Sequence, residues 1–508
     1  MVYLGIDLGT SSVKILATND KNEILGDITK EYPVEFPQEK WAQQNPEDWW
    51  LQTVEGIREL VEALDIPRDH IRAIGFSGQM HGLVALGEKN DVLTPAILWC
   101  DQRTQVECDE IAAFFGPDKL SEHTGNKALT GFTAPKILWV KKHLPKVFSQ
   151  IRHILLPKDY IRLMLTGDYA TDVSDASGML LLDVKKRQWS PELLDFLGIS
   201  VAQLPKLYES YAVTGVVSQE AKALLGLTGE ILVVGGAGDQ AAGAVGTGTV
   251  EDGIVSVTLG TSGVVFAAHE TFALDSENRM HAFCHANGKY HSMGVMLSAA
   301  NCLNWWAESV NPGIGFDVLL EEAAAVEPGS NRLMFLPYLM GERTPYADPD
   351  ASGCFVGMTM NTGRGAMTRA VLEGVAYGLY DSLKILEDMG VPVRQVRVIG
   401  GGARSALWKQ ILADVFDIEM QEINTNQGGA LGAAILAAVG AGQYSDVSEG
   451  CRAMVQVVNA IPPIPENVRT YSQLYPLYQE LYGSLKAWFK TSASVVESTL
   501  ETSGKAGV

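Results

Sequence analysis

Residues 4–15 read LGIDLGTSSVKI, and residues 254–266 read IVSVTLGTSGVVF. In each stretch apolar and β-branched residues flank a Gly-Thr-Ser turn, a pattern that predicts a β-hairpin. The separation of Gly9 from Gly260 is 251 residues (260 − 9), close to half of the 508-residue chain. The repetition predicts two similar halves, each opening with a hairpin whose turn exposes backbone N–H and hydroxyl groups.

The rest of the chain predicts strands that alternate with helices, which is typical of an α/β fold. The strands are predicted at 71–76, 231–234 and 396–399, and the helices at 46–64, 367–386, 405–416 and 430–440. The helix at 430–440 is Ala-rich and apolar all round, so it is expected to be buried.

The chain is expected to divide into an N-terminal lobe, residues 1–246, and a C-terminal lobe, residues 247–490, because the division between the halves falls within the Gly-rich stretch 243–253. Residues 491–508 are rich in Ser, Thr and small residues. That composition predicts a flexible tail.

Composition excludes several classes of protein. With 39 basic and 60 acidic residues the net charge is −21, which is unsuited to binding nucleic acid or an anionic membrane through charge. The six Cys are sparse and never in C-x-x-C spacing, which predicts a reducing compartment without structural zinc. No apolar run of about 18 residues occurs and no signal peptide is recognised, so the expected location is the cytoplasm.

The first hairpin has the residue types of a phosphate site. Glycine lets the backbone approach a ligand closely, and successive N–H groups can cradle phosphate oxygens. Asp7, at the end of the first strand, is placed to orient Mg²⁺ through water. The alternative is an ordinary hairpin with a polar turn, and the repeat at Gly260 and Thr261 favours the phosphate interpretation.

A glycine turn at 400–405 follows a predicted strand and precedes a predicted helix. Small residues there leave room for a flat ring, and a helix N-terminus offers N–H donors. The alternatives are a dinucleotide-binding turn or plain strand–helix packing. The turn does not fit G-x-G-x-x-G with its acidic residue, and no P-loop motif occurs, so a split ATP site is favoured.

Two further loops carry candidate residues for chemistry on an alcohol. Asp239 lies on the small-residue turn GGAGDQAAG at 235–243, where it is either the acceptor of a hydroxyl proton or a cap of the following helix. Met80 and His81 follow the strand at 71–76 and are flanked by Gly. The His81 imidazole could hydrogen-bond a polyol, although an isolated His is more often structural.

Taken together, these segments resemble the FGGY carbohydrate kinases from Tyr3 to about Trp488. The two family signatures are matched by FTAPKILW at 132–139 and GGGARSALWKQILAD at 400–414. Three more stretches, at 79–82, 98–104 and 171–178, are similar to the members of that family that act on D-xylulose.

The resemblance implies two ribonuclease-H-like lobes of the actin/sugar-kinase superfamily, with ATP and sugar in the cleft between them. It implies ATP-dependent phosphorylation of D-xylulose at its 5-hydroxyl, with Asp239 as general base and Asp7 as the carboxylate near Mg²⁺. The implied sugar-binding residues are Met80, His81, Asp239 and Gln240. The implied ATP-binding residues are Thr10, Ser11, Lys14, Gly260, Thr261, Asn304, Gly401, Gly402 and Ser405.

Three other functions compete with this one. A related kinase could act on ribulose, gluconate or glycerol. An actin-like ATPase acting on a protein partner would need no base at Asp239. A sugar sensor without catalysis is disfavoured by the presence of both Asp7 and Asp239. The expected partners are a small-molecule sugar and ATP, without nucleic acid or membrane, and a homodimer is the assembly considered.

Overall fold

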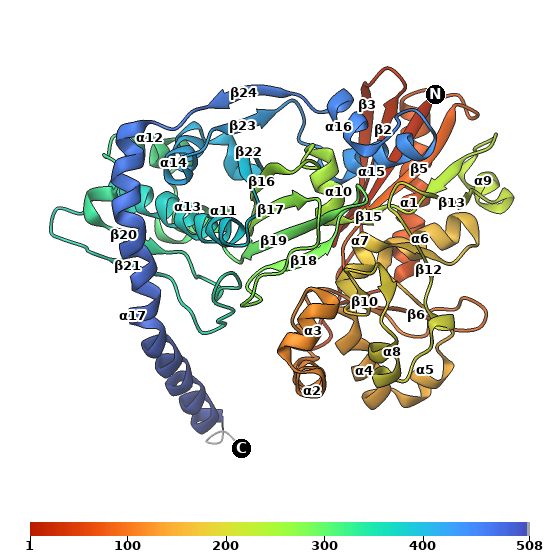
Figure 1. The fold of residues 1–508 in the computed structure, drawn as a ribbon, viewed down its shortest axis with the longest axis horizontal. Helices are drawn as coiled ribbons and strands as arrows, with labels where there is room; N and C mark the ends of the chain where they lie inside the picture. The colour runs from red at the N-terminus through yellow and green to blue at the C-terminus, as the bar shows by residue number, and fades with distance from the viewer. Residues whose placement is uncertain (505–508) are drawn as a thin grey trace. The chain divides into compact units, whose positions relative to one another are not determined.

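The computed structural model describes residues 1–504 of the chain. The chain forms two compact units (Figure 1). Unit 1 comprises Met1–Asp252, Ala268–Ser292 and Thr425–Gln456, and unit 2 comprises Gly253–Ala267, Met293–Asn424 and the residues from Val457 onward. Both units are therefore discontinuous in sequence, whereas the division at residue 246 treats each lobe as one continuous segment.

Unit 1 contains a seven-stranded sheet in the order β13-β14-β5-β1-β2-β3, with β15 paired to β5. Its strands are β1 (Val2–Leu8), β2 (Ser12–Asn19), β3 (Ile24–Glu31), β5 (Ile71–Gly78), β13 (Val213–Val216), β14 (Leu232–Val234) and β15 (Ala237–Gly238). The β1–β2 hairpin is antiparallel, and β1 is parallel to β5. Strand β5 is in turn parallel to β14, and β14 is antiparallel to β13.

The second seven-stranded sheet, in the order β18-β19-β17-β16-β22-β23-β24, repeats this arrangement. Its strands are β16 (Gly253–Leu259), β17 (Gly263–His269), β18 (His281–Cys284), β19 (Tyr290–Met296), β22 (Val393–Ile399), β23 (Met420–Ile423) and β24 (Val457–Ile461). Here too an antiparallel hairpin, β16–β17, is followed by two parallel neighbours and one antiparallel strand. The repeat seen in the sequence is thus a repeat of topology.

The remaining strands form short two-stranded ribbons. They are β4 (Gln43–Gln44) with β7 (Ala96–Ile97), β6 (Val84–Leu86) with β8 (His153–Leu155), β9 (Ala170–Asp172) with β12 (Lys206–Tyr208), β10 (Leu182–Asp183) with β11 (Gln188–Trp189), and β20 (Met334–Leu336) with β21 (Cys354–Val356).

Helices occur in both units, and only some of them pack on the seven-stranded sheets. In unit 1 they are α1 (Pro46–Ala63), α2 (Gln105–Phe115), α3 (Pro117–Thr124), α4 (Thr133–His143), α5 (Pro145–Gln150), α6 (Pro157–Thr166), α7 (Val173–Ala176), α8 (Pro191–Leu197), α9 (Gln219–Leu225), α10 (Asp239–Gly246), α15 (Gly428–Gly440) and α16 (Val447–Met454). In unit 2 they are α11 (Ala300–Trp305), α12 (Phe316–Ala324), α13 (Arg364–Asp388), α14 (Ala406–Phe416) and α17 (Pro465–Gly504).

Helix α15 packs backbone to backbone on its neighbours in unit 1. A Cβ atom on Gly5 of β1 would overlap the carbonyl oxygen of Ala430, and one on Gly246 of α10 would overlap that of Gly428. Only glycine permits so close an approach. The positions of β1 and α10 are therefore both set by the same helix, and these are the elements on which Asp7 and Asp239 lie.

The predicted hairpins, strands and helices are confirmed, with ends shifted by a few residues. Helix α17 runs from Pro465 to Gly504 and so includes residues 491–504 of the segment for which composition predicts a flexible tail. Earlier in this helix, Tyr471 and Tyr478 are buried and so is Phe489. That anchored first part gives the helix a folded base from which to extend. Residues 505–508 lie outside the described residues.

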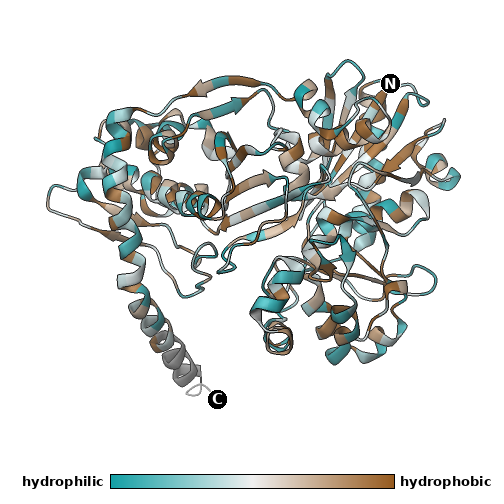
Figure 2. Cartoon of the chain, viewed as in Figure 1, coloured by the Kyte–Doolittle hydropathy of each residue, from teal (hydrophilic) through white to brown (hydrophobic). Residues whose placement is uncertain are grey.

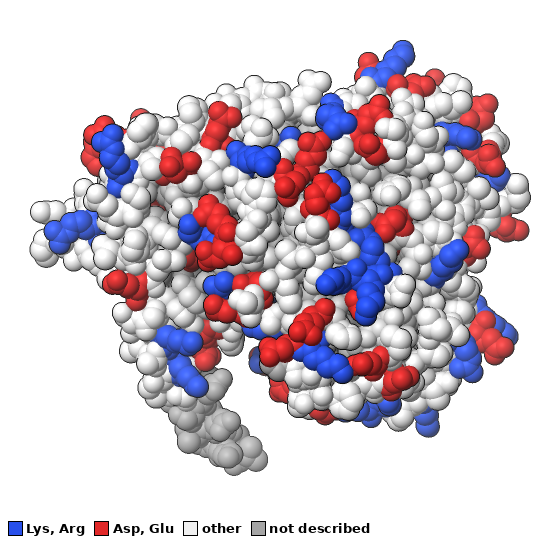
Figure 3. Space-filling model, viewed as in Figure 1, with Lys and Arg blue, Asp and Glu red and all other residues white. Residues whose placement is uncertain are grey.

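Hydrophobic residues run along the strands of both sheets and along α15 (Figure 2). Acidic and basic side chains are interspersed on the face shown in Figure 3. Within the described part of the chain, no helix has the length and apolar character needed to cross a membrane.

Candidate active site

The carboxylates predicted to carry the chemistry lie at one edge of the unit 1 sheet. Asp7 is the penultimate residue of β1, and its partner in the parallel strand β5 is Ser77. On the other side of β5, Ala237 of β15 pairs with the same Ser77, and α10 begins at Asp239. The carboxyl ends of parallel strands meet at one edge of a sheet, which is where α/β folds build ligand sites.

Asp7 is held by a hydrogen bond of 2.6 Å that the Ser77 hydroxyl donates to its Oδ1. Burial raises the pKa of Asp7, while this hydrogen bond and the charge of Lys14 act in the opposite direction. Lys14 lies opposite Asp7 in the antiparallel hairpin and hydrogen-bonds Gln427. Ser77 has no part in the sequence prediction, although it lies only three residues before Met80.

Asp239 is the first residue of α10. Its carboxylate accepts hydrogen bonds from the backbone N–H of Gln240 at 2.9 Å and from the Gln240 side chain at 3.3 Å. Burial and then the negative charge of Asp7 raise the pKa of Asp239 to about 6. Such a group is mostly ionised at neutral pH and is still basic enough to accept a proton in a transition state.

The Met80–His81 loop follows β5 and packs beside the Asp239 turn. A Cβ atom on Gly238 would lie 2.8 Å from Met80 Cγ, so Met80 covers the residue before Asp239. His81 has a φ of 70°, and its Nδ1 lies 2.6 Å from the carbonyl oxygen of Gly178. The loop thus brings the predicted sugar-contacting residues to the same place as the predicted base.

Residues of the first family signature hold this loop in place. Thr133 Oγ1 and Lys136 Nζ donate hydrogen bonds to the His81 carbonyl oxygen at 3.0 and 2.9 Å. Phe132 packs against the His81 ring edge-on, with centroids 4.7 Å apart. Burial lowers the pKa of Lys136 to about 7. These contacts could not be predicted from the sequence, because they join residues about 50 positions apart.

The turn of the first hairpin is fixed by side chains from later segments. Trp99 Nε1 donates to Thr10 Oγ1 at 3.0 Å, and Gln44 Nε2 donates to the Thr10 carbonyl oxygen at 2.7 Å. Ser11, the next residue, is exposed. Trp99 is a contact that the sequence did not predict, although it lies in a quoted motif.

The predicted nucleotide residues of unit 2 line one cavity of about 630 Å³. Its lining is Leu259, Gly260, Thr261, Ala300, Leu303, Asn304, Phe316, Asp317, Leu320, Gly401, Gly402, Arg404, Ser405 and Trp408. Every ATP-binding residue predicted beyond the first hairpin is among them. Phe316, Asp317 and Leu320 were missed, because α12 carries no motif that would mark it.

The glycine turn forms an open wall of this cavity. A Cβ atom on Gly401 would meet no atom within 4 Å, whereas one on Gly402 would lie 2.9 Å from the Leu259 Cβ. The Ser405 hydroxyl accepts a hydrogen bond of 3.2 Å from the backbone N–H of Trp408, which caps α14. Ser405 therefore has a structural role in addition to its place in the cavity.

No group of three or more His, Cys, Asp or Glu side chains suited to hold a metal occurs among residues with described placement. A protein cage for a cation is thus not built into this part of the chain. Mg²⁺ in kinases is typically held by one or two carboxylates, water and the phosphates of the substrate, so a single carboxylate such as Asp7 fits that mode of binding.

The sequence matches the models of two domains that belong to one protein family. Residues 2–246 match the N-terminal domain, and residues 255–441 the C-terminal domain, of the FGGY family of carbohydrate kinases. The chain belongs to this family, and its two-unit α/β structure is the sugar kinase fold.

Individual relatives agree with this assignment. The xylulose kinase of Escherichia coli is 42% identical over 453 residues, covering 88% of this chain and 92% of the relative. The crystal structure of the "xyloylose kinase" of Brucella ovis has a TM-score of 0.92 and 39% identity, covering 96% of this chain and 100% of that one. The gluconate kinase of Lactobacillus acidophilus has a TM-score of 0.92 and 29% identity, with coverage of 96% and 99%.

Proposed function

We propose that this chain phosphorylates D-xylulose at its 5-hydroxyl group, with Mg-ATP as the phosphoryl donor and Asp239 as the general base. The observation that carries the proposal is the Asp239 carboxylate at the edge of the sheet, beside Asp7 and the Met80–His81 loop. The relatives that are named xylulose kinases support the choice of substrate.

In this mechanism Asp239 accepts the proton of the attacking hydroxyl group. The transferring phosphoryl group passes through a loose, metaphosphate-like transition state, so positioning and charge stabilisation dominate the catalysis. The base is needed late, when the new P–O bond has made the hydroxyl acidic. A pKa of about 6 suits this role, because Asp239 is ionised before the reaction at neutral pH.

On the donor side of the reaction, the unit 2 cavity would bind the nucleotide. Gly260, Thr261 and Asn304 line that cavity together with Gly401. Backbone N–H groups of such turns bind phosphate oxygens, and the open wall at Gly401 offers space for a flat base. Asp7 would hold Mg²⁺ through water, and the cation would neutralise charge on the transferring phosphoryl group.

The competing proposal is that a different sugar, a sugar acid or a polyol is the substrate. It is favoured by the likeness to the gluconate kinase of Lactobacillus acidophilus, which reaches the same TM-score of 0.92 at lower identity. Ribulose and glycerol are the other substrates to be tested. The higher identity to xylulose kinases, 38% and 42%, supports D-xylulose as the first choice.

The test is ATP turnover in a coupled assay with no sugar, D-xylulose, D-ribulose, gluconate or glycerol. We expect D-xylulose to give the highest kcat/KM and a stoichiometric phosphorylated product. A higher kcat/KM with another of these compounds would replace D-xylulose as the proposed substrate and leave the proposal of a kinase intact. ATP turnover that ignores every sugar and rises only with a protein partner would overturn the proposal.

A further inference from the structure

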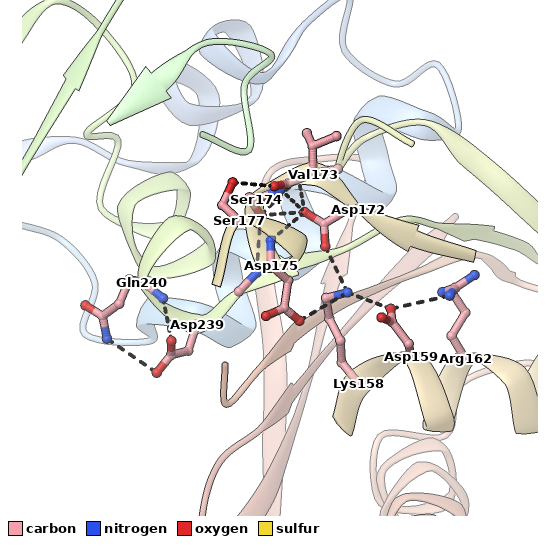
Figure 4. Close-up of polar contacts among 12 residues, drawn as sticks. Lys158, Asp159, Arg162, Asp172, Val173, Ser174, Asp175, Ser177, Asp239 and Gln240 are labelled. Carbon is pink, nitrogen blue, oxygen red and sulfur yellow. Dashed lines mark hydrogen bonds and ion pairs between the residues drawn. The ribbon is translucent and has the colours of Figure 1, made fainter. Parts of the chain in front are cut away.

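Unit 1 contains a buried ionic cluster that is linked by hydrogen bonds to the turn carrying Asp239. Lys158 of α6 is 1% exposed, and its Nζ lies 2.7 Å from Asp159, 2.8 Å from Asp172 and 3.3 Å from Asp175. Figure 4 shows Lys158 between these carboxylates, with Arg162 reaching Asp159. A buried charge is tolerated only when it is paired, so Lys158 fixes the segment that begins at Asp172.

Asp172 connects Lys158 to Ser174. The Asp172 oxygen that does not face Lys158 accepts hydrogen bonds from the Ser174 hydroxyl at 2.5 Å and from the Ser210 hydroxyl at 2.9 Å. It also caps α7 by accepting from the Ser174 backbone N–H at 2.8 Å. Ser174 and Ser210 are both 0% exposed, so water does not compete for these bonds.

Ser174 then contacts the turn that carries the candidate base. Its hydroxyl oxygen accepts a hydrogen bond of 3.3 Å from the backbone N–H of Gly238, the residue before Asp239. In the described contacts Ser210 makes no bond to Gly238, although its hydroxyl donates to the Ser174 hydroxyl at 3.4 Å. The two serines therefore share the anchor Asp172 and differ in their reach to the catalytic turn.

The hydrogen bonds to the Asp239 carboxylate are local ones. The two hydrogen bonds that this carboxylate accepts both come from its neighbour Gln240 on the same helix, so they do not tie the carboxylate to another element. The other end of the Asp172 segment also reaches the site, since the Gly178 carbonyl oxygen lies 2.6 Å from His81 Nδ1. One buried segment thus contacts both the residue before Asp239 and the ring of His81.

We propose that Ser174, anchored through Asp172 to Lys158, is a positioning residue that sets the orientation of Asp239 for proton transfer. The inference rests on the proposed function, because it assigns Ser174 a part in the same reaction. Small displacements of a catalytic group are costly to the rate, since about 1 Å can cost a factor on the order of 10².

The experiment compares Ser174→Ala with the matched control Ser210→Ala. Both remove one buried serine hydroxyl from the same Asp172 oxygen, and only the first removes the acceptor of the Gly238 N–H. We expect Ser174→Ala to lower kcat for D-xylulose about tenfold, and Ser210→Ala to stay within about twofold of wild type. The dissociation constant and binding stoichiometry of D-xylulose, measured by calorimetry, should stay within about twofold in both.

The calorimetric stoichiometry separates positioning from folding, because a smaller folded fraction lowers it and misplacement of Asp239 does not. If Ser174→Ala does not fold, Ser174→Cys is compared in the same way, since a thiol fills the site and accepts hydrogen bonds weakly. Equal kcat values for the two serine variants, or a loss confined to sugar affinity, would overturn the inference while leaving the kinase intact. A wild-type protein that phosphorylates no sugar would instead overturn the proposed function, and this inference with it.

Discussion

Asp7 acts on Asp239 through its charge. After burial, the negative charge on Asp7 is the next contribution that raises the pKa of Asp239 to about 6. The two carboxylates come from β1 and from the start of α10, and both elements pack on α15. A negative charge beside a carboxylate raises its pKa, so the two carboxylates of a close pair release their protons at different pH values. One of them can then serve as a base while the other stays available to a cation.

Asp239→Asn is expected to abolish sugar phosphorylation while the protein stays folded. A general base contributes typically about 10²–10⁴-fold, so kcat should fall by that factor. The measurement is the coupled assay with D-xylulose, with circular dichroism as the check of the fold. A folded variant that retains the wild-type kcat would remove Asp239 from the mechanism.

The same substitution is expected to stabilise the protein at neutral pH. Between pH 3.8 and about 6 the folded state binds a proton that the unfolded chain has already released, so the stability contributed by Asp239 falls as pH rises through this window. Asn carries no charge, and at pH 7 it should raise the free energy of unfolding by up to about 3 kcal/mol. Chemical unfolding at pH 7 and pH 4 tests this, since the gain should vanish at pH 4.

Ser77→Ala is expected to reduce activity more at low pH than at high pH. The Ser77 hydroxyl stabilises the ionised form of Asp7, and its loss lets the pKa of Asp7 rise further. The ratio of variant to wild-type kcat/KM should therefore be smaller at pH 5 than at pH 8. Ser77→Cys keeps a weak donor in a similar volume, so its kcat/KM at pH 5 should lie between those of the wild type and Ser77→Ala. A ratio that does not change with pH would contradict the role of this hydrogen bond.

Gly401→Leu is expected to weaken ATP binding without unfolding the protein. A side chain at Gly401 enters open space on the wall of the cavity, where it would occupy room needed by the nucleotide. We expect the dissociation constant for ATP to rise at least about tenfold, which corresponds to about 1.4 kcal/mol. The control is Gly363→Leu, also in unit 2, where a Cβ meets no atom within 4 Å and the residue does not line the cavity. Equal ATP affinity in the two variants would argue against this cavity as the nucleotide site.

The sequence predicted those parts of the site whose residues are neighbours along the chain. Asp7 lies beside its glycine turn, Asp239 lies within a run of small residues, and Gly401 stands between a strand and a helix. Each combination is local, and it limits the backbone conformations strongly enough to indicate a ligand site.

Contacts between distant segments could not be predicted in this way. Ser174 meets Gly238 across 64 residues, and Gly5 meets Ala430 across more than 400. Nothing in hydrophobic periodicity specifies which faces will meet, because that is decided by tertiary packing. For the same reason Phe316 was missed, since it follows no turn or charge pattern that marks it as part of a cavity.

The late position of α15 in the sequence has a consequence for protein synthesis. Residues 425–456 belong to unit 1, although most of that unit has been translated by Asp252. At about 5–20 residues per second, the 188 residues between Asp252 and Gly440 (440 − 252) take roughly 10–40 s to synthesise, so β1 and β5 wait longer than that on the ribosome before the helix that covers them is complete. During that interval the glycine-lined face of the sheet is exposed to chaperones and proteases. Limited proteolysis of stalled nascent chains should show unit 1 protected when a chain ends well beyond residue 456, and cleaved when it ends before residue 425.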